Sequence, residues 1–260
     1  MNLAWKKLIH TFLNLILPRS CAGCGAKNEI FCGNCQLASY KRGAQCLFCG
    51  FRNQTGAVCQ SCKNVKHSMF DKTAVKHVLW VGRYDGALKE AIWQFKYKKR
   101  KELAAPLAEM LWNKFLEINI MNVENATLKD NHAIIPIPLH FKKEYERGFN
   151  QAELLAREFC KLSNIQCLTN VLIKTRETKA QVAVDNKELR IKNLEGAFCI
   201  NPKISQSNLS LLTSHALILI DDVATTGATL IHASETLAKV GLPCRQAGAK
   251  KIIGLVVAHG

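Results

Sequence analysis

Eight cysteines in the first quarter of the chain are spaced like metal ligands. They form four C-x-x-C pairs, and consecutive pairs are separated by seven, ten and nine residues: Cys21, Cys24, Cys32, Cys35, Cys46, Cys49, Cys59 and Cys62. A two-residue gap lets both sulfurs of a tight turn point at one ion, and glycines beside several pairs supply the backbone freedom that such turns use. The spacing predicts one or two tetrahedral zinc sites with four cysteine ligands each, structural because four thiolates leave no open coordination position.

Two other chemistries use the same side chains. Disulfides are disfavoured because the chain carries no recognisable secretion signal and thiols stay reduced inside the cell. Iron–sulfur clusters use cysteine ligands too and stay open as an alternative. The spacing does not say which pairs combine. The remaining cysteines stand singly among apolar residues and are predicted to be core residues: Cys160, Cys167, Cys199 and Cys244.

A second pattern with chemistry follows an apolar run near residue 220. It contains two acids, a hydroxyl-rich stretch and one glycine before a helical pattern: Asp221, Asp222, Ala224, Thr225, Thr226, Gly227, Ala228 and Thr229. Backbone N–H groups converge at a strand-to-helix junction of this kind, so the loop is suited to a phosphate monoester. The two carboxylates would repel phosphate, so we expect them to face ribose hydroxyls or a divalent cation. The pattern predicts a ribose 5-phosphate site; an ordinary capped helix is the alternative.

Hydrophobic patterning predicts the elements that position these residues. Short, unalternating, β-branched runs predict strands buried on both faces of a parallel sheet, at 133–137, 171–173, 216–220 and 252–257. Helical patterns occur at 88–95, 103–115, 151–162 and 228–240. The alternation predicts a doubly wound α/β domain, with the Ser- and Asn-rich stretch 201–214 as a surface loop.

Composition divides the chain into three parts. Residues 1–20 form a predicted amphipathic helix, stopped by Pro18, whose two lysines beside a tryptophan leave packing, a membrane surface or a partner open as its use. Residues 21–70 form the cysteine module, which is too small to fold without metal. Residues 71–260 form the α/β domain.

The charge balance points to a polyanionic partner. The 260-residue chain has 36 Lys and Arg against 20 Asp and Glu, a formal net charge of +16. Its first 70 residues contain nine of these cations and one acid, so the excess is clustered. No run approaches the roughly 18 apolar residues of a membrane span, and no signal peptide is recognisable. We expect a cytoplasmic protein, with peripheral contact at the inner membrane as an alternative.

A basic run interleaved with aromatic residues follows the first helical pattern of the α/β domain. Its cations are Lys96, Lys98, Lys99, Arg100 and Lys101, and Lys41 and Arg42 lie on the cysteine module. Proteins bind single strands without sequence preference through cations that neutralise the phosphate backbone of the nucleic acid and aromatic rings that stack on its bases. The run therefore predicts contact with single-stranded DNA; a solvated lysine-rich turn is the alternative.

Several blocks resemble a known family. Asp221 to Thr229 resembles the phosphoribosyl diphosphate (PRPP) motif of type I phosphoribosyltransferases. Further matching blocks are Pro136 to His140, Arg147 to Ala152 and the segment 178–198, and together they resemble the ComF family of competence proteins, ComFC type. That family also begins with a cysteine-rich zinc domain, and the resemblance covers nearly the whole chain.

The resemblance implies a type I phosphoribosyltransferase fold and a cytosolic factor for natural transformation that handles incoming single-stranded DNA. By position, Asp221 and Asp222 would hold the ribose hydroxyls, residues 224–229 the 5-phosphate, and Mg²⁺ would bridge diphosphate and ribose. The loops implied to lie near the diphosphate or to close over it contain Leu139, His140, Arg147, Gln181 and Arg190. Ala224 stands where relatives often carry a bulkier residue, a small departure because this part of the loop acts through its backbone.

The sequence leaves catalysis open. No general base stands out, and the chain ends at Gly260 directly after its last predicted strand, which leaves little polypeptide for the hood that nucleobase-using relatives place over the site. We therefore expect either a protein that binds PRPP and single-stranded DNA, or a working phosphoribosyltransferase whose acceptor the sequence does not disclose. Other proteins of the DNA-uptake apparatus are further candidate partners, through the zinc module.

Overall fold

The computed structural model describes residues 19–46, 52–53, 59–60, 74–122, 132–177, 194–240 and 252–260. Most of the predicted helix over residues 1–20 lies outside these ranges; its last two residues are described and are not helical, and Ser20 forms an isolated antiparallel bridge with Lys27. Also outside these ranges are Cys49, Cys62, Cys244 and the predicted mobile loop with Gln181 and Arg190.

A five-stranded sheet with the order β3-β9-β8-β4-β5 lies at the centre, and each neighbouring pair is parallel. Its strands are β3 (Val75–Arg83), β4 (His132–Pro136), β5 (Gln166–Cys167), β8 (Ala216–Ala224) and β9 (Ile252–His259). The predicted strands at 133–137, 216–220 and 252–257 are confirmed. They are the three inner strands, which explains their unbroken apolar runs. The pattern missed β3, an edge strand that Lys76, His77 and Gly82 interrupt.

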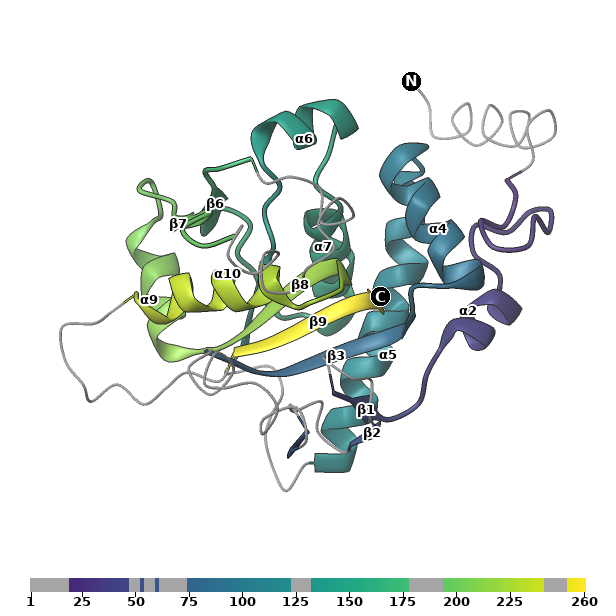
Figure 1. Cartoon of the computed structure of the whole chain (residues 1–260), viewed down its shortest axis with the longest axis horizontal. Coiled ribbons are helices and arrows are strands. Elements are labelled where there is room, and N and C mark those ends of the chain that lie inside the picture. Colours follow the sequence, from purple (N-terminus) through teal and green to yellow (C-terminus); the bar gives the residue numbers. More distant parts are fainter. Residues whose placement is uncertain are drawn as a thin grey trace, which may run out of the picture.

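Helices cover both faces of the sheet (Figure 1). One core packs under α4 (Gly86–Tyr97), α5 (Ala104–Asn122) and α7 (Gln151–Ser163), the other under α9 (Gln206–Ser214) and α10 (Ala228–Ala238). Alternate residues of β8 divide between the two cores: Ile218 and Ile220 face the first, Leu217 and Leu219 the second. The predicted doubly wound α/β arrangement is confirmed.

Two details of the predicted topology are wrong. The run 171–173 does not join the parallel sheet: β6 (Leu172–Lys174) pairs antiparallel with β7 (Phe198–Ile200) in a separate two-stranded sheet. The stretch 201–214 is not only loop, because its second half forms α9. The Ser205 hydroxyl caps this helix by accepting from the Asn208 N–H at 3.2 Å, and Leu212 is buried beneath it. Serine and asparagine here mark a helix start rather than a turn.

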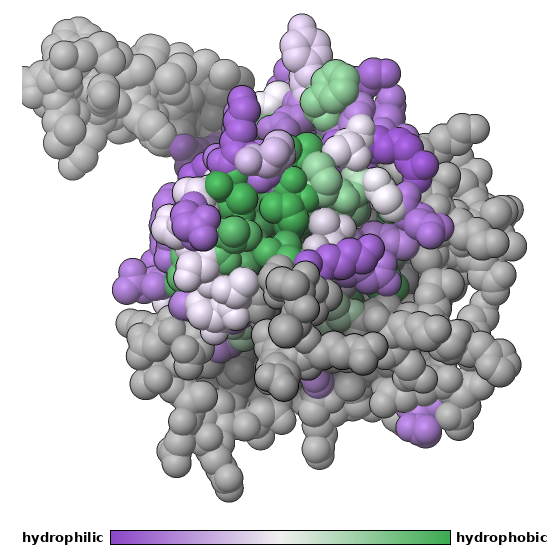
Figure 2. All heavy atoms as spheres, turned by 90° about the vertical axis from the view of Figure 1, so that its left-hand side faces the viewer, coloured by the Kyte–Doolittle hydropathy of each residue, from purple (hydrophilic) through white to green (hydrophobic). Residues whose placement is uncertain are grey.

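An apolar patch framed by polar side chains is visible when the molecule is viewed from the side of α9, α10 and the two-stranded β6–β7 sheet (Figure 2). Partly buried apolar residues packed against the second core include Ile200, Ile204, Leu209 and Leu211. They belong to β7, the turn after it and α9, so this side of the second core is only partly covered by the described residues.

The first two cysteine pairs belong to a compact segment, Cys21 to Ser39, that packs on α4 and β3 and is called the knuckle below. It contains α2 (Gly33–Ser39) and leads to the short antiparallel strands β1 (Ala44–Gln45) and β2 (Arg52–Asn53). The Lys41 N–H donates to the Val81 carbonyl at 2.8 Å. A Cβ on Gly82 would lie 2.1 Å from the Ser39 carbonyl oxygen, so only glycine allows this close approach.

A buried lysine of α5 forms hydrogen bonds with the chain segment that follows the knuckle. Lys114 is fully buried, and its Nζ donates to the carbonyls of Lys41 and Gly43 and lies 3.2 Å from the Glu117 carboxylate. Glu117 also accepts from the Tyr40 hydroxyl at 2.8 Å and from the Gly43 N–H at 2.7 Å. The buried ammonium is therefore fully hydrogen-bonded, as a buried charge must be to avoid a large desolvation penalty.

Candidate functional site

The loop between β8 and α10 brings the residues of the predicted phosphate site together. β8 runs to Ala224, so Asp221 and Asp222 are part of the strand, and Asp221 pairs with Val256 of β9. Gly227 then takes φ of 72° as the residue that precedes α10, a left-handed conformation that favours glycine. A small hollow of about 10 Å³, partly open to solvent, is lined by Asp221, Val223, Ala224, Thr225, Gly227, Ala228, Thr229 and Leu230.

Thr226 and Asp222 are buried neighbours, along the chain, of the residues that line this hollow. Thr226 is buried, and its Oγ1 accepts from the Ala228 N–H at 3.4 Å, so it shapes the start of α10. Asp222 is buried as well, and its side chain turns towards α4. The Asp221 carboxylate accepts from the Asp222 N–H at 2.8 Å, which fixes the rotamer of the first acid.

The two adjacent acids have unlike surroundings. Burial, and then the neighbouring charge of Asp222, raises the pKa of Asp221 to about 7, against the lowering effects of the Asp222 N–H, Lys96 and Lys174. Asp222 forms an ion pair in which its Oδ1 lies 2.8 Å from Lys96 Nζ, with only 15% of the lysine side chain and 11% of the aspartate side chain exposed. The site thus combines one carboxylate held by an ammonium group with one that titrates near neutral pH.

Lys96 belongs to this acidic site rather than to an open basic surface. Burial alone would lower the pKa of Lys96, but the charges of Asp222 and Asp221 offset it, so the pKa lies above its ordinary value and the side chain stays charged. The sequence contains a signal for this placement: Lys96 follows Leu88 and Ile92 at helical spacing on the buried face of α4. A lysine at such a position needs a buried partner.

The loop after β4 lies beside the same site. Leu139 is half-buried, and His140 precedes α6 (Phe141–Arg147) and forms an isolated parallel bridge with Lys174. The Arg147 Nη1 donates to Gln151 Oε1 at 2.8 Å, and the guanidinium lies over the Tyr97 ring at 5.4 Å. The charge of Lys174 lowers the pKa of Asp221, and the charge of Arg147 lowers the pKa of Lys96.

Two buried polar atoms near this loop lack a partner among the described residues. They are His140 Nδ1 and Gln151 Nε2, in side chains of residues that are 4% and 1% exposed. The Asn150 amide, by contrast, ties the loop to α7: it donates to the Ile137 carbonyl at 3.0 Å and accepts from the Ala152 N–H at 3.1 Å. The loop is rigidly held while retaining unused hydrogen-bonding groups.

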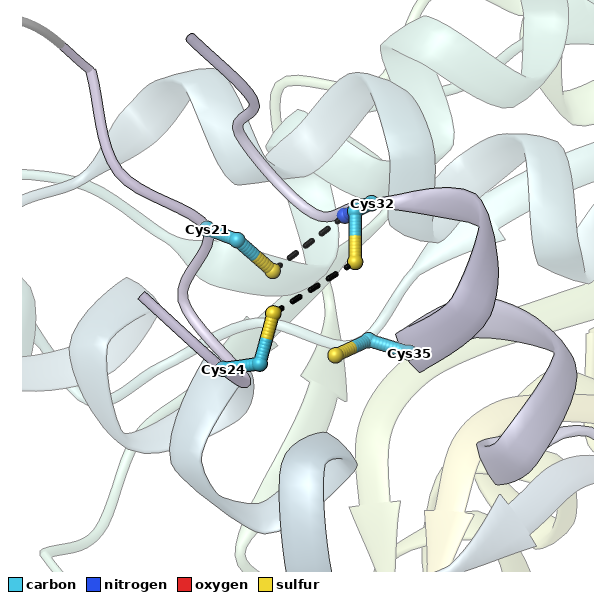
Figure 3. A group of neighbouring side chains, drawn as sticks. All are labelled: Cys21, Cys24, Cys32 and Cys35. Atoms are coloured by element: carbon cyan, nitrogen blue, oxygen red, sulfur yellow. Dashed lines mark hydrogen bonds between the residues drawn. The ribbon is translucent and has the colours of Figure 1, made fainter. Parts of the chain in front are cut away.

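Four sulfurs of the knuckle converge on one point (Figure 3). The ligand atoms of Cys21, Cys24, Cys32 and Cys35 all lie within 4.8 Å of one another, and the Cys24 and Cys32 sulfurs are 3.6 Å apart. A tetrahedron with zinc–sulfur bonds of about 2.3 Å has sulfur–sulfur edges of about 3.8 Å, so the residues fit a zinc ion. The first pair therefore combines with the second, which the spacing alone does not decide.

Backbone N–H groups favour the thiolate form of Cys21, the first ligand of the knuckle. The Cys21 sulfur accepts from Cys32 N at 3.3 Å and from Gly23 N at 3.4 Å. Burial acts to raise the pKa of Cys21, but these backbone hydrogen bonds bring it down to about 6. Such N–H···S bonds orient the ligands of a metal before it binds.

The other two cysteine pairs are represented by one residue each. The Cys59 N–H donates to the Cys46 sulfur at 3.4 Å, so these pairs also approach one another. Their partners Cys49 and Cys62 fall outside the described residues, and a second zinc site remains a prediction.

The predicted DNA-contacting cations differ in their surroundings. Lys98 and Lys99 are exposed, and Lys98 Nζ lies 5.2 Å from the centre of the Trp93 ring. Lys101 Nζ lies over the Phe149 ring at 5.0 Å. Arg100 donates from all three guanidinium nitrogens, to Ser20, Gln94 and Glu102. Lys41 and Arg42 are exposed after the knuckle.

Among the described residues, no helix has the length and apolar character that a membrane span requires.

Known proteins resemble this chain over most of its length, although no family model matches it. Competence protein F of Haemophilus influenzae is 30% identical over 219 residues, which covers 84% of this chain and 87% of that protein. Competence protein ComFC of Bacillus subtilis is 27% identical over 216 residues, or 82% and 80% of the two chains. DNA utilization protein YhgH of Escherichia coli is 26% identical over 167 residues, or 64% and 67%.

Proposed function

The chain belongs to the ComF family of competence proteins, and on this premise we propose that it handles incoming single-stranded DNA in the cytoplasm while binding a phosphoribosyl ligand. Its role lies in competence and DNA uptake. The observation that carries the ligand assignment is that Asp221 and the threonine-bearing loop at the start of α10 line one hollow.

The chemistry of that junction favours a ribose 5-phosphate over free phosphate. Gly227 and Thr229 bring backbone N–H groups and a threonine hydroxyl to the positive end of α10. Asp221 lines the same hollow from the strand side, and its carboxylate form accepts hydrogen bonds from hydroxyl groups such as those of a ribose. A molecule with a phosphate at one end and a diol at the other satisfies both sides.

Divalent metal and zinc have separate places in this proposal. Mg²⁺ would accompany PRPP and neutralise its diphosphate, next to the loop with Leu139 and His140. Zinc would be held by Cys21, Cys24, Cys32 and Cys35, whose closed tetrahedral set gives it a structural role.

The contact with DNA rests on charge and exposed rings. The chain carries a net charge of +16, and Lys98, Lys99, Trp93 and Tyr97 are exposed together around the end of α4. Cations that neutralise phosphates and rings that stack with bases bind single strands with little sequence preference. Lys96 is assigned to the phosphoribosyl site and not to this surface.

Calorimetric titration of the zinc-loaded full chain with PRPP and Mg²⁺ tests the proposal. We expect saturable binding, and Asp221→Asn weakens it by about tenfold or more, because a hydrogen bond to an ionised group contributes on the order of 1.5–3 kcal/mol. Asp85→Asn, which changes an exposed aspartate before α4, is the matched control.

The same titration is then repeated with a single-stranded oligonucleotide bound. Absence of PRPP binding to the unmodified protein contradicts the ligand assignment. Release of diphosphate from PRPP in the presence of a nucleobase would instead favour the second candidate, an active phosphoribosyltransferase, which the retained acid pair and loop also suit.

A further inference from the structure

A groove lies where the knuckle meets α4. Its lining consists of Arg19, Ser20, Trp93, Gln94, Lys98, Arg100 and Glu102, and it encloses about 390 Å³. Two of these residues precede the first cysteine and the others belong to α4 and the turn after it, so the groove exists only because the two parts pack together. Figure 1 shows the knuckle with α2 beside α4.

Arg100 holds the groove in shape. Its Nη2 donates to the Ser20 carbonyl at 2.9 Å, its Nη1 to Gln94 Oε1 at 2.8 Å and its Nε to Glu102 at 2.8 Å. Gln94 in turn donates to the Ala22 carbonyl at 3.2 Å. One guanidinium therefore ties the knuckle to α4, which leaves little conformational entropy to lose when a ligand enters.

Two aromatic rings extend from this groove along α4. Trp93 is 40% exposed and Tyr97 is 57% exposed, and their ring centres are 6.1 Å apart at an angle of 49°. Each ring has a cation against it, Lys98 on Trp93 and Arg147 on Tyr97. Single exposed aromatics are ordinary on protein surfaces, but two neighbouring rings with paired cations form a stacking platform.

We propose that this groove and the adjoining Tyr97 ring bind consecutive nucleotides of a single strand, with bases stacked on Trp93 and Tyr97 and a phosphate paired with Lys98. The lining carries three cationic side chains and one carboxylate, which complements a polyanion. A strand whose bases are unpaired can present a π-face to each ring, whereas a duplex keeps its bases stacked inside.

The Tyr97 end of the platform adjoins a residue of the phosphoribosyl site. Tyr97 directly follows Lys96, which pairs with Asp222, and the Arg147 guanidinium lies over the Tyr97 ring. This inference rests on the proposed role in handling single strands and specifies where the strand lies.

Fluorescence anisotropy with a labelled oligothymidine and the zinc-loaded full chain tests the placement. We expect Trp93→Ala and Tyr97→Ala each to weaken binding about tenfold, the effect of losing one stacked base. Tyr145→Ala is the matched control, because Tyr145 is 89% exposed on α6 outside the platform, and its affinity should stay within about twofold of the unmodified protein. Thermal unfolding of each variant confirms that the fold is intact.

The outcomes separate this inference from the proposed function. If the unmodified protein fails to bind the oligonucleotide, single-strand handling itself is contradicted. If it binds and Trp93→Ala and Tyr97→Ala bind as tightly as Tyr145→Ala, the platform is overturned while single-strand handling stands. A duplex that competes as well as the single strand also overturns the stacking assignment.

Discussion

Near the end of β8, two adjacent carboxylates lie close to one ammonium group, and the ion pair between Asp222 and Lys96 is largely buried. Lys96 holds Asp222, while burial and the charge of Asp222 raise the pKa of Asp221 to about 7 from the ordinary 3.8. The folded protein therefore keeps a proton on Asp221 that the unfolded chain releases. The stability that this proton contributes is fully present below about pH 4 and is lost as the pH rises through 7.

We expect Lys96→Met to lower the free energy of unfolding by roughly 3 kcal/mol at pH 8 and by clearly less at pH 5, because removal of one partner of a buried pair leaves an uncompensated charge. At pH 5 a protonated Asp221 leaves one carboxylate in the site, whereas at pH 8 two repel each other. Urea unfolding at both pH values measures the difference.

Lys89→Met, on the exposed face of the same helix, is the control and should change stability by no more than about 0.5 kcal/mol. The double variant Lys96→Met/Asp222→Asn should recover part of the loss. An equal loss at the two pH values would show that the ion pair does not interact with Asp221.

At the scale of elements, the knuckle depends on glycine where its two halves meet. A Cβ on Gly23 would lie 2.7 Å from the Cys35 sulfur and 2.8 Å from the Ala87 Cβ, so it would press on a zinc ligand and on α4 at once. We predict that Gly23→Ala lowers stability by about 1–3 kcal/mol, the usual range for overpacking, and weakens zinc retention. Thermal unfolding and zinc release to a chelator measure the two effects.

Gly33 provides the matched substitution at the start of α2. A Cβ there meets no atom within 4 Å, and alanine favours the helix, so Gly33→Ala should be neutral or slightly stabilising. If Gly23→Ala changed neither zinc retention nor the melting temperature, the prediction would be wrong. The knuckle would then be packed less tightly at Gly23 than these distances indicate.

At the scale of the whole molecule, the excess of positive charge makes binding to a strand dependent on salt. We expect affinity for a single-stranded oligonucleotide to fall roughly 20- to 100-fold between about 50 and 200 mM salt if three to five phosphates are neutralised. Anisotropy titrations at several salt concentrations give the slope of log affinity against log salt.

The substitutions that test this slope leave Arg100 intact, because its guanidinium builds the groove. Lys98→Ala/Lys99→Ala should flatten the slope by about 1.4, since each of the two phosphate contacts contributes about 0.7. Lys161→Ala/Lys203→Ala removes two exposed lysines elsewhere and should leave the slope unchanged. If the affinity of the unmodified protein for the oligonucleotide did not change with salt concentration, binding through the phosphates would be contradicted.

Local patterns along the chain were enough to predict the inner strands, the four main helices that pack on them, the glycine turn before α10 and the cysteine pairs. Burial periodicity and backbone requirements are local properties. Its errors also have local causes: β6 is too short for its pattern to reveal its pairing partner, and Ser205 reads equally well as a loop residue or a cap.

Three contacts become known only from the folded chain: Lys96 pairs with Asp222, Arg100 joins Ser20 to α4, and the first two cysteine pairs combine. Each of these contacts links segments far apart in the chain. The free energy of a charged or metal-binding side chain depends on the partners that lie within a few ångströms of it in the folded chain. The order of basic residues in a sequence does not show which partners those are.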